Sequence, residues 1–222
     1  MVIGVIKERA GENYKVDINS PHTAILNLTS FDGATRRNRP DLRPGSLVYA
    51  RMLGSHFGGE LDPEISCISP PNASMGRKDW VTGLSMFGEL KDGFMIHVSS
   101  GVCRQLLQRE NVLLGLLGER VPFEIAVGLN GRVWVCAQES CILENTPTTA
   151  TGGGTKVVNK EEVEAAHVRN TILIANAIQN AEFLTSTQQM KQMADQLFAT
   201  GGGGSGSGGV SSSSAAPKKK KK

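Results

Sequence analysis

The first 69 residues alternate hydrophobic and polar side chains over short stretches, and turn residues separate these stretches at close intervals. Alternation with a period of two is typical of strands that bury one face, so this part predicts a small all-β domain. The expected strands cover residues 2–6, 14–18, 24–28, 47–52 and 65–68. A long connection between the third and fourth strands favours a Greek-key barrel of the OB type over residues 1–69, and an SH3-like barrel is the competing interpretation.

That long connection, residues 31–45, reads FDGATRRNRPDLRPG and carries the densest positive charge outside the C-terminal tail. Its glycines and prolines indicate a loop. Guanidinium groups fit phosphate oxygens, and loops of OB barrels commonly bind oligonucleotides, so the segment predicts contact with RNA or DNA. The alternatives are a solvated turn, or arginines that pair with acidic groups of a partner subunit. The arginines are Arg36, Arg37, Arg39 and Arg43.

A change of pattern after residues 70–79, a hinge rich in turn residues, predicts a second domain that mixes helices and strands. An alternating stretch around Ile96 predicts a strand, and Ser99 or Ser100 can cap the helix that follows. Two further strands, at residues 123–127 and 132–135, are joined by the sequence GLNG. Asn130 followed by Gly131 predicts a type I′ hairpin turn, in which both residues have positive φ. Valine at position 130 is therefore expected to destabilise the domain.

The pattern of the second domain is interrupted and then resumes. Residues 144–163 contain Pro147, several threonines and a run of glycines, which is the composition of a flexible insertion. Residues 164–200 return to the helical spacing of apolar side chains. The second domain is thus expected over residues 80–143 and 164–200. Residues 201–222, a Gly/Ser-rich stretch followed by lysines, are expected to be disordered.

Charge and composition narrow the class of protein. The chain has 222 residues, with 24 lysines and arginines against 21 aspartates and glutamates. Because the last five residues are all lysine, the rest of the chain is close to neutral. No stretch is apolar over the roughly 18 to 20 residues that a membrane-spanning helix needs, and the first residues lack the apolar core of a signal peptide. We expect a soluble, unsecreted protein.

No motif for catalysis or metal binding stands out in the sequence. The cysteines have neither zinc-site spacing nor a secretory context for disulfides, so we expect reduced, mostly buried thiols in a cytosolic or nuclear protein. The histidines are scattered, and the acidic pairs are interpreted as solvated. GLNG formally matches the GXXG loop with which KH domains clamp nucleotides, yet strand-like sequence flanks it where that loop joins two helices. No catalytic residue, metal site or cofactor is predicted.

Three segments together carry a resemblance to a known family: FDGATRRNRPDLRPGSLVYARM, GLNGRVWV and TILIANAI. Their combination closely resembles the cap subunits of the eukaryotic RNA exosome of the ribosomal RNA-processing protein 40 type, over residues 2–198 apart from the insertion. The resemblance implies an all-β OB-fold (S1-type) barrel followed by an α/β KH domain. In that family a GxNG sequence replaces the RNA-clamping loop and packs between the two domains. Gly128, Asn130 and Gly131 match it and are expected to be structural.

The resemblance also implies a function. Such a subunit is noncatalytic, binds RNA, and sits with two other cap proteins on a ring of six RNase PH-like subunits, which it stabilises while it guides RNA 3′ ends into the channel. Associated 3′-5′ exoribonucleases would carry out rRNA processing, RNA surveillance and RNA degradation in the nucleus, the nucleolus and the cytoplasm, away from membranes. The expected RNA-binding residues are Arg36, Arg37 and Arg39, with Lys15 and Phe31 as weaker candidates.

Three features depart from the family pattern. The family usually has a domain before the barrel, whereas this sequence starts almost at the first expected strand, so we expect that the domain's contacts are missing or that the gene model is truncated. Nothing in its composition assigns a role to the insertion. The lysine tail fits a nuclear-import signal, a loose RNA contact or a solvated tail. A free-standing S1/KH RNA-binding regulatory protein and a nuclease are the alternative functions.

Overall fold

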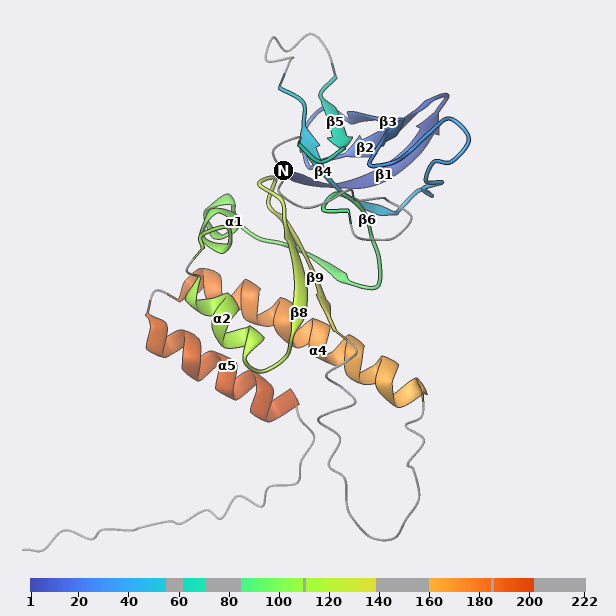
Figure 1. Cartoon of the computed structure of the whole chain (residues 1–222). Helices are drawn as coiled ribbons and strands as arrows, with labels where there is room; N and C mark the ends of the chain where they lie inside the picture. The colour runs from blue at the N-terminus through green and yellow to red at the C-terminus, as the bar shows by residue number, and fades with distance from the viewer. Residues whose placement is uncertain (55–61, 71–84, 110, 139–159, 185, 202–222) are drawn as a thin grey trace, which may run out of the picture.

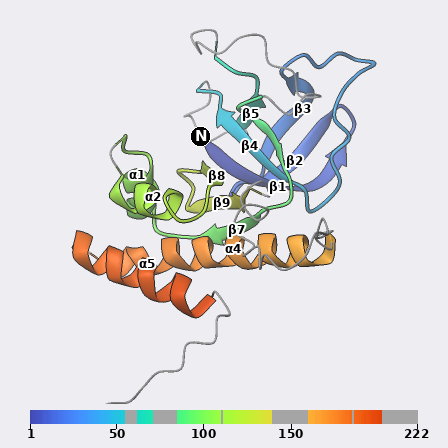
Figure 2. The same ribbon diagram turned by 60° about the horizontal axis from the view of Figure 1, so that its bottom comes forward.

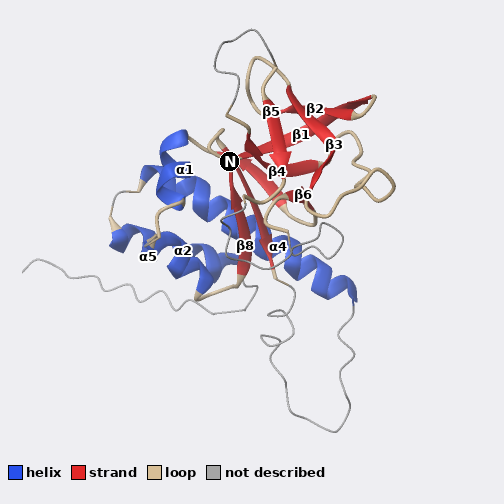
Figure 3. Cartoon of the chain, turned by 45° about the horizontal axis from the view of Figure 1, so that its top comes forward, coloured by secondary structure: helices blue, strands red, loops and turns tan. Residues whose placement is uncertain are grey.

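The computed structural model describes residues 1–54, 62–70, 85–109, 111–138, 160–184 and 186–201. The N-terminal strands form a barrel, and the rest of the described chain forms a three-stranded sheet with helices (Figure 1). Figure 3 shows the barrel strands on one side of the molecule and the helices on the other. Within the described residues, no helix combines the length and the hydropathy that would let it span a membrane.

The barrel closes by strand pairing, which leaves its first and fourth strands without a free edge between them. Its sheet has the order β1-β2-β3-β5-β4, and β4 pairs back onto β1. The pairing between β3 and β5 is parallel, and the other pairings are antiparallel. The prediction of an OB-type barrel is therefore confirmed. The strands are β1 (Val2–Ala10), β2 (Asn13–Asp17), β3 (Ala24–Phe31), β4 (Leu47–Met52) and β5 (Glu64–Cys67).

A sixth strand extends the barrel sheet beyond the limit expected from the sequence. β6 (Gly88–Leu90) pairs antiparallel with β4, and Phe87 is 2% exposed in the barrel core, where its ring lies 5.3 Å from that of Tyr49. The sheet thus reaches Leu90 instead of ending at residue 69. The sequence pattern predicts that residues 80–90 belong to the second domain, because a three-residue strand shows too little alternation to be detected.

The second domain has the α/β arrangement expected of a KH domain. Its sheet has the order β7-β9-β8, α4 packs against β9 and β7, and α5 packs against α4 and α2. Figure 2 shows α4 and α5 on one side of this sheet. The elements are β7 (Phe94–His97), α1 (Ser100–Leu106), α2 (Val112–Gly118), β8 (Phe123–Val127), β9 (Arg132–Ala137), α4 (Lys160–Asn180), η1 (Ala181–Phe183) and α5 (Thr187–Gly201).

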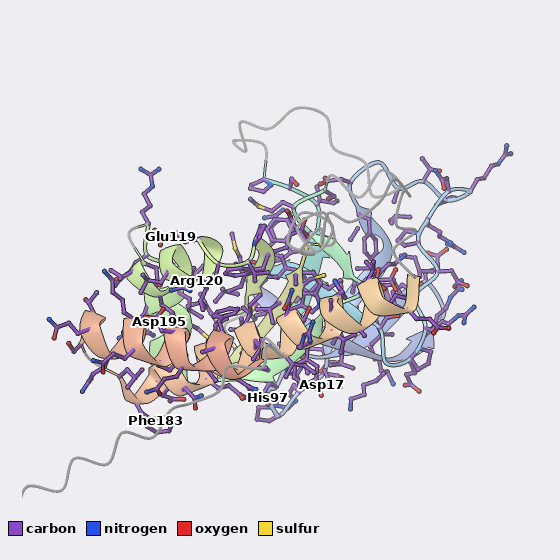
Figure 4. The ribbon with its side chains drawn as sticks, turned by 90° about the horizontal axis from the view of Figure 1, so that it is seen from below. Asp17, His97, Glu119, Arg120, Phe183 and Asp195 are labelled. Atoms are coloured by element: carbon purple, nitrogen blue, oxygen red, sulfur yellow. The ribbon has the colours of Figure 1, made fainter. Side chains whose placement is uncertain are left out.

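Side chains at the helix ends explain where the helices begin and how they are held. The hydroxyl of Ser99 accepts a bond from the Val102 amide, and Asn111 Oδ1 accepts one from the Leu114 amide at 3.0 Å, so both short helices have side-chain caps. Arg120 after α2 forms an ion pair with Asp195 of α5 (Figure 4). Residues 160–163, expected within the flexible insertion, belong to α4, and residue 201 belongs to α5. Residues 144–159 and 202–222 lie outside the described residues.

Candidate nucleic-acid interface

The arginine loop, residues 32–46, connects β3 to β4 on the barrel. Arg36, Arg37 and Arg43 are exposed, and Arg39 is half-buried. Within the described part of the chain, none of these arginines forms an ion pair. Their guanidinium groups are thus available to phosphate oxygens, which they can contact through two parallel hydrogen bonds.

Backbone hydrogen bonds give the arginine loop a defined shape. The Thr35 amide donates to the Asn38 carbonyl at 2.8 Å, and the Asn38 amide donates to the Thr35 hydroxyl at 3.0 Å. These two bonds close a small turn whose central residues are Arg36 and Arg37. At the end of the loop, the Gly45 amide donates to the Ile6 carbonyl of β1 at 2.8 Å. Arg36 and Arg37 therefore lie on a turn whose shape is fixed by hydrogen bonds.

The two weaker candidates lie in different surroundings. Lys15 is exposed on β2, but its Nζ donates to Glu8 Oε1 at 2.7 Å, and this bond raises the pKa of Lys15 and lowers that of Glu8. Phe31 is 3% exposed, with its ring in the barrel core, so it has no face on which a base could stack. The prediction that Phe31 contacts RNA is therefore wrong. Ala24, Leu26 and Leu28 are buried at every second position of β3, but Phe31 departs from this spacing where the pairing with β5 is irregular, so alternation alone does not predict its burial.

The GxNG hairpin, residues 128–131, reaches the barrel beside the N-terminal end of β1 (Figure 1). The Gly128 amide donates to the Arg132 carbonyl at 2.9 Å and closes a three-residue loop. Gly131 has a positive φ of +80°. Among the described non-glycine residues, only Asn19 and Asp92 have a positive φ, so Asn130 does not. The expected type I′ turn is therefore wrong. The loop has the form in which an ordinary turn is followed by a glycine in the left-handed region.

Asn130 connects the hairpin to the barrel through its side-chain amide. Its Oδ1 accepts from the Ile3 amide at 3.2 Å, and its Nδ2 donates to the carbonyls of Ile3 and Ile18, both at 2.8 Å. A side chain at Gly128 would meet the Ile3 nitrogen at 2.8 Å and the Arg132 carbonyl at 3.0 Å, so only glycine fits between hairpin and barrel. Asn130 and Gly128 thus join the hairpin to the barrel through hydrogen bonds and close packing.

Sequence reasoning missed three further side chains at this domain boundary. Arg132 is 5% exposed, and its guanidinium donates to the Asp17 carbonyl at 2.6 Å and to Asp17 Oδ2 at 3.1 Å. Tyr49 donates its hydroxyl hydrogen towards the Val127 carbonyl at 3.2 Å. An arginine in a strand is normally expected at the surface, so the sequence carries no signal for its burial against a distant aspartate.

The Asp17 carboxylate is stabilised in its charged form. Three groups lower the pKa of Asp17, which is labelled in Figure 4. The hydrogen bond from the Asn19 backbone amide has the largest effect, and the positive charges of Arg132 and Lys7 add to it. A carboxylate whose pKa is lower in the folded state stabilises the fold above its unfolded pKa of about 4 and loses this effect as the pH falls through the folded pKa.

We expect the difference in unfolding free energy between the native chain and Asp17→Asn to be largest near neutral pH and to shrink below about pH 4. Asparagine keeps an oxygen that can accept from the Asn19 amide but cannot form the ion pair with Arg132. Urea unfolding at pH 7 and pH 3 measures the difference. A difference that grows on acidification would contradict the role of the charged carboxylate.

Reactive side chains are dispersed within the described residues. No group of three or more histidine, cysteine, aspartate or glutamate side chains there is placed to hold a metal ion. Cys67 and Cys103 are buried, and burial raises the pKa of both thiols. Cys136 is partly exposed, and Cys141 lies outside the described residues.

Comparison with known proteins identifies both domains. Residues 1–78 match the family model of the S1 domain of exosome complex component RRP40, and residues 93–140 match that of a KH domain. Exosome complex component rrp40 of Schizosaccharomyces pombe is 40% identical over 87% of this chain and 65% of its own length. Human RRP40 is 30% identical over 88% of this chain and 57% of its length, and the Saccharomyces cerevisiae protein is 37% identical over 65% and 55%.

A solved structure supports the fold independently. A protein assigned as an exosome complex RNA-binding protein superposes with a TM-score of 0.54 over 90% of this chain and 93% of its own, at 19% identity, which shows the fold alone. The chain spans between about half and two thirds of the length of the RRP40 proteins above. The chain thus combines an S1 domain of the RRP40 type with a KH domain, and over most of its length it is similar to proteins named exosome complex component RRP40.

Proposed function

We propose that this protein is a noncatalytic subunit of the RNA exosome, where it binds RNA in the cap and guides 3′ ends into the channel of the ring. The observation that carries the proposal is the arginine loop, which presents Arg36 and Arg37 on a fastened turn without ion-pair partners among the described residues. The RRP40-type S1 domain and the similarity to exosome complex components named RRP40 support the complex in which such a surface would act.

The chemistry of the arginine loop fits RNA of any sequence. Guanidinium groups contact phosphate oxygens, which are the same at every nucleotide, so the binding is sequence-independent and weakens with salt. The buried position of Phe31 removes an aromatic platform from the base of this loop. We infer that the loop binds RNA weakly through the sugar-phosphate backbone of the RNA. Such weak contacts allow the RNA strand to advance past the loop.

The remaining parts of the proposal concern partners and location. The subunit would contact RNase PH-like ring subunits and other cap subunits, and associated 3′-5′ exoribonucleases would supply the hydrolysis. We expect the complex in the nucleus, the nucleolus and the cytoplasm.

Affinity purification of the tagged chain from its native cells, with RNase treatment and native mass spectrometry, tests the proposal. We expect stoichiometric recovery of the ring and the other cap subunits, because protein contacts rather than shared RNA hold the complex. A variant with Arg36, Arg37 and Arg39 changed to alanine should be recovered in the same assembly, since these residues are proposed to contact RNA. Recovery of the chain alone would contradict the proposal and favour a free-standing RNA-binding protein.

A further inference from the structure

Tyr14 lies beneath the arginine loop with its ring in the barrel core. It is fully buried on β2, where it pairs with Arg9 of β1 and Leu26 of β3. Its hydroxyl donates to the Pro40 carbonyl at 3.1 Å and accepts from the Leu42 amide at 3.0 Å. One side-chain group therefore satisfies two backbone groups of the loop, at positions where Pro40 and Leu42 are themselves buried.

These two bonds hold the segment of the loop that directly follows Arg39. A buried carbonyl or amide that loses its partner is costly, so without the hydroxyl this segment would move towards water to recover hydrogen bonds. Besides the packing of Leu42 in the barrel core, the segment has a polar contact in the ion pair between Arg9 and Asp41 at 3.4 Å, whose side chains are 44% and 84% exposed. Exposed pairs of this kind contribute little to order, so the hydroxyl is the stronger fastening.

We propose that Tyr14 is a positioning residue for RNA binding: its hydroxyl fixes the arginine loop in the shape that presents Arg36, Arg37 and Arg39 to phosphate groups. This inference rests on the proposed RNA-binding function of the loop. A loop already ordered before binding does not lose conformational freedom when RNA arrives, and this preorganisation strengthens binding without any contact between Tyr14 and RNA.

Tyr14→Phe removes the hydroxyl and keeps the ring in the core. Tyr49→Phe is the matched control, because Tyr49 is also a buried tyrosine, and its hydroxyl lies within donating distance of the Val127 carbonyl and Met1 Sδ, both outside the loop. Binding of the full chain to a fluorescently labelled single-stranded RNA of 12 nucleotides would be measured as a function of salt. We expect Tyr14→Phe to weaken binding about fivefold and Tyr49→Phe to leave it unchanged.

Two further readouts separate positioning from general destabilisation. Hydrogen exchange of the Leu42 amide should accelerate in Tyr14→Phe and stay at the native rate in Tyr49→Phe. In a chain whose Arg36, Arg37 and Arg39 are alanine, Tyr14→Phe should have no further effect on RNA binding, because the groups that it positions are absent.

The outcomes are distinguishable. Native affinity in Tyr14→Phe, or an equal loss in the Tyr49→Phe control, would overturn the positioning role and leave the RNA-binding role of the loop intact. The positioning role would also be overturned if Tyr14→Phe weakened binding as much in the triple alanine variant as it does in the native chain. Native affinity of the triple alanine variant itself would overturn both the proposed function and this inference.

Discussion

Asn130→Ala is expected to lower the free energy of unfolding by about 3 kcal/mol, because it removes three hydrogen bonds between hairpin and barrel in one step. The Ile3 amide and the carbonyls of Ile3 and Ile18 lose their partner together. Asn130 is half-buried, so water replaces only part of these hydrogen bonds in the alanine variant. Urea denaturation followed by circular dichroism would measure the loss.

The matched control for this change is Asn176→Ala, at an exposed position on α4. Alanine has a higher helix propensity than asparagine, so the control should unfold with unchanged or slightly increased free energy. Equal stability of Asn130→Ala and the native chain would show that the amide contacts do not hold the domains together. The sequence predicted that valine at position 130 destabilises the domain because of a positive φ, but Asn130 does not have a positive φ. A substitution at this position is instead expected to destabilise the domain through the lost hydrogen bonds.

Changing Arg36, Arg37 and Arg39 together to alanine is expected to weaken binding of single-stranded RNA by on the order of 30-fold near physiological salt. Each exposed charge contact contributes up to about 1 kcal/mol, and three act together here. The dependence of the logarithm of affinity on the logarithm of salt concentration should also become shallower by about 2, since each lost phosphate contact on a single strand removes about 0.7.

Lys191→Ala on α5 is a control for this experiment, because it removes an exposed positive charge from the other domain. It should leave the salt dependence unchanged. The triple variant should unfold at nearly the native urea concentration, since no described ion pair involves the three arginines. A triple variant that unfolds while Asn130→Ala stays stable would reverse the roles assigned to loop and hairpin.

The sequence was most informative where one physical pattern dominates. Alternating side chains predicted the five strands of the barrel, and the long connection predicted its OB topology, because burial of one face of each strand leaves little choice of register. The Asn-Gly pair predicted a hairpin between β8 and β9 but not its turn type. Both types accept the same residues, and contacts with the barrel decide between them.

Features that depend on distant contacts were beyond the reach of the sequence. Arg132 is buried only because the Asp17 carbonyl and carboxylate lie within reach of its guanidinium. Phe87 joins the barrel core although turn-rich sequence precedes it, and β6 adds to the sheet with only three residues. The RNA-binding assignment of Phe31 failed for the same reason, since only the closed barrel shows where its ring points.

The link between Ile3 and Asn130 also has a consequence for the order in which the chain folds. The two residues are 127 positions apart, so the first barrel strand cannot complete its hydrogen bonds until the hairpin has been made. At a synthesis rate of about 5–20 residues per second, that interval is roughly 6 to 25 seconds. Contacts between such distant positions also slow folding, because a long loop must close before they form. The nascent barrel therefore passes through a period in which its opening strand depends on pairing within the barrel alone.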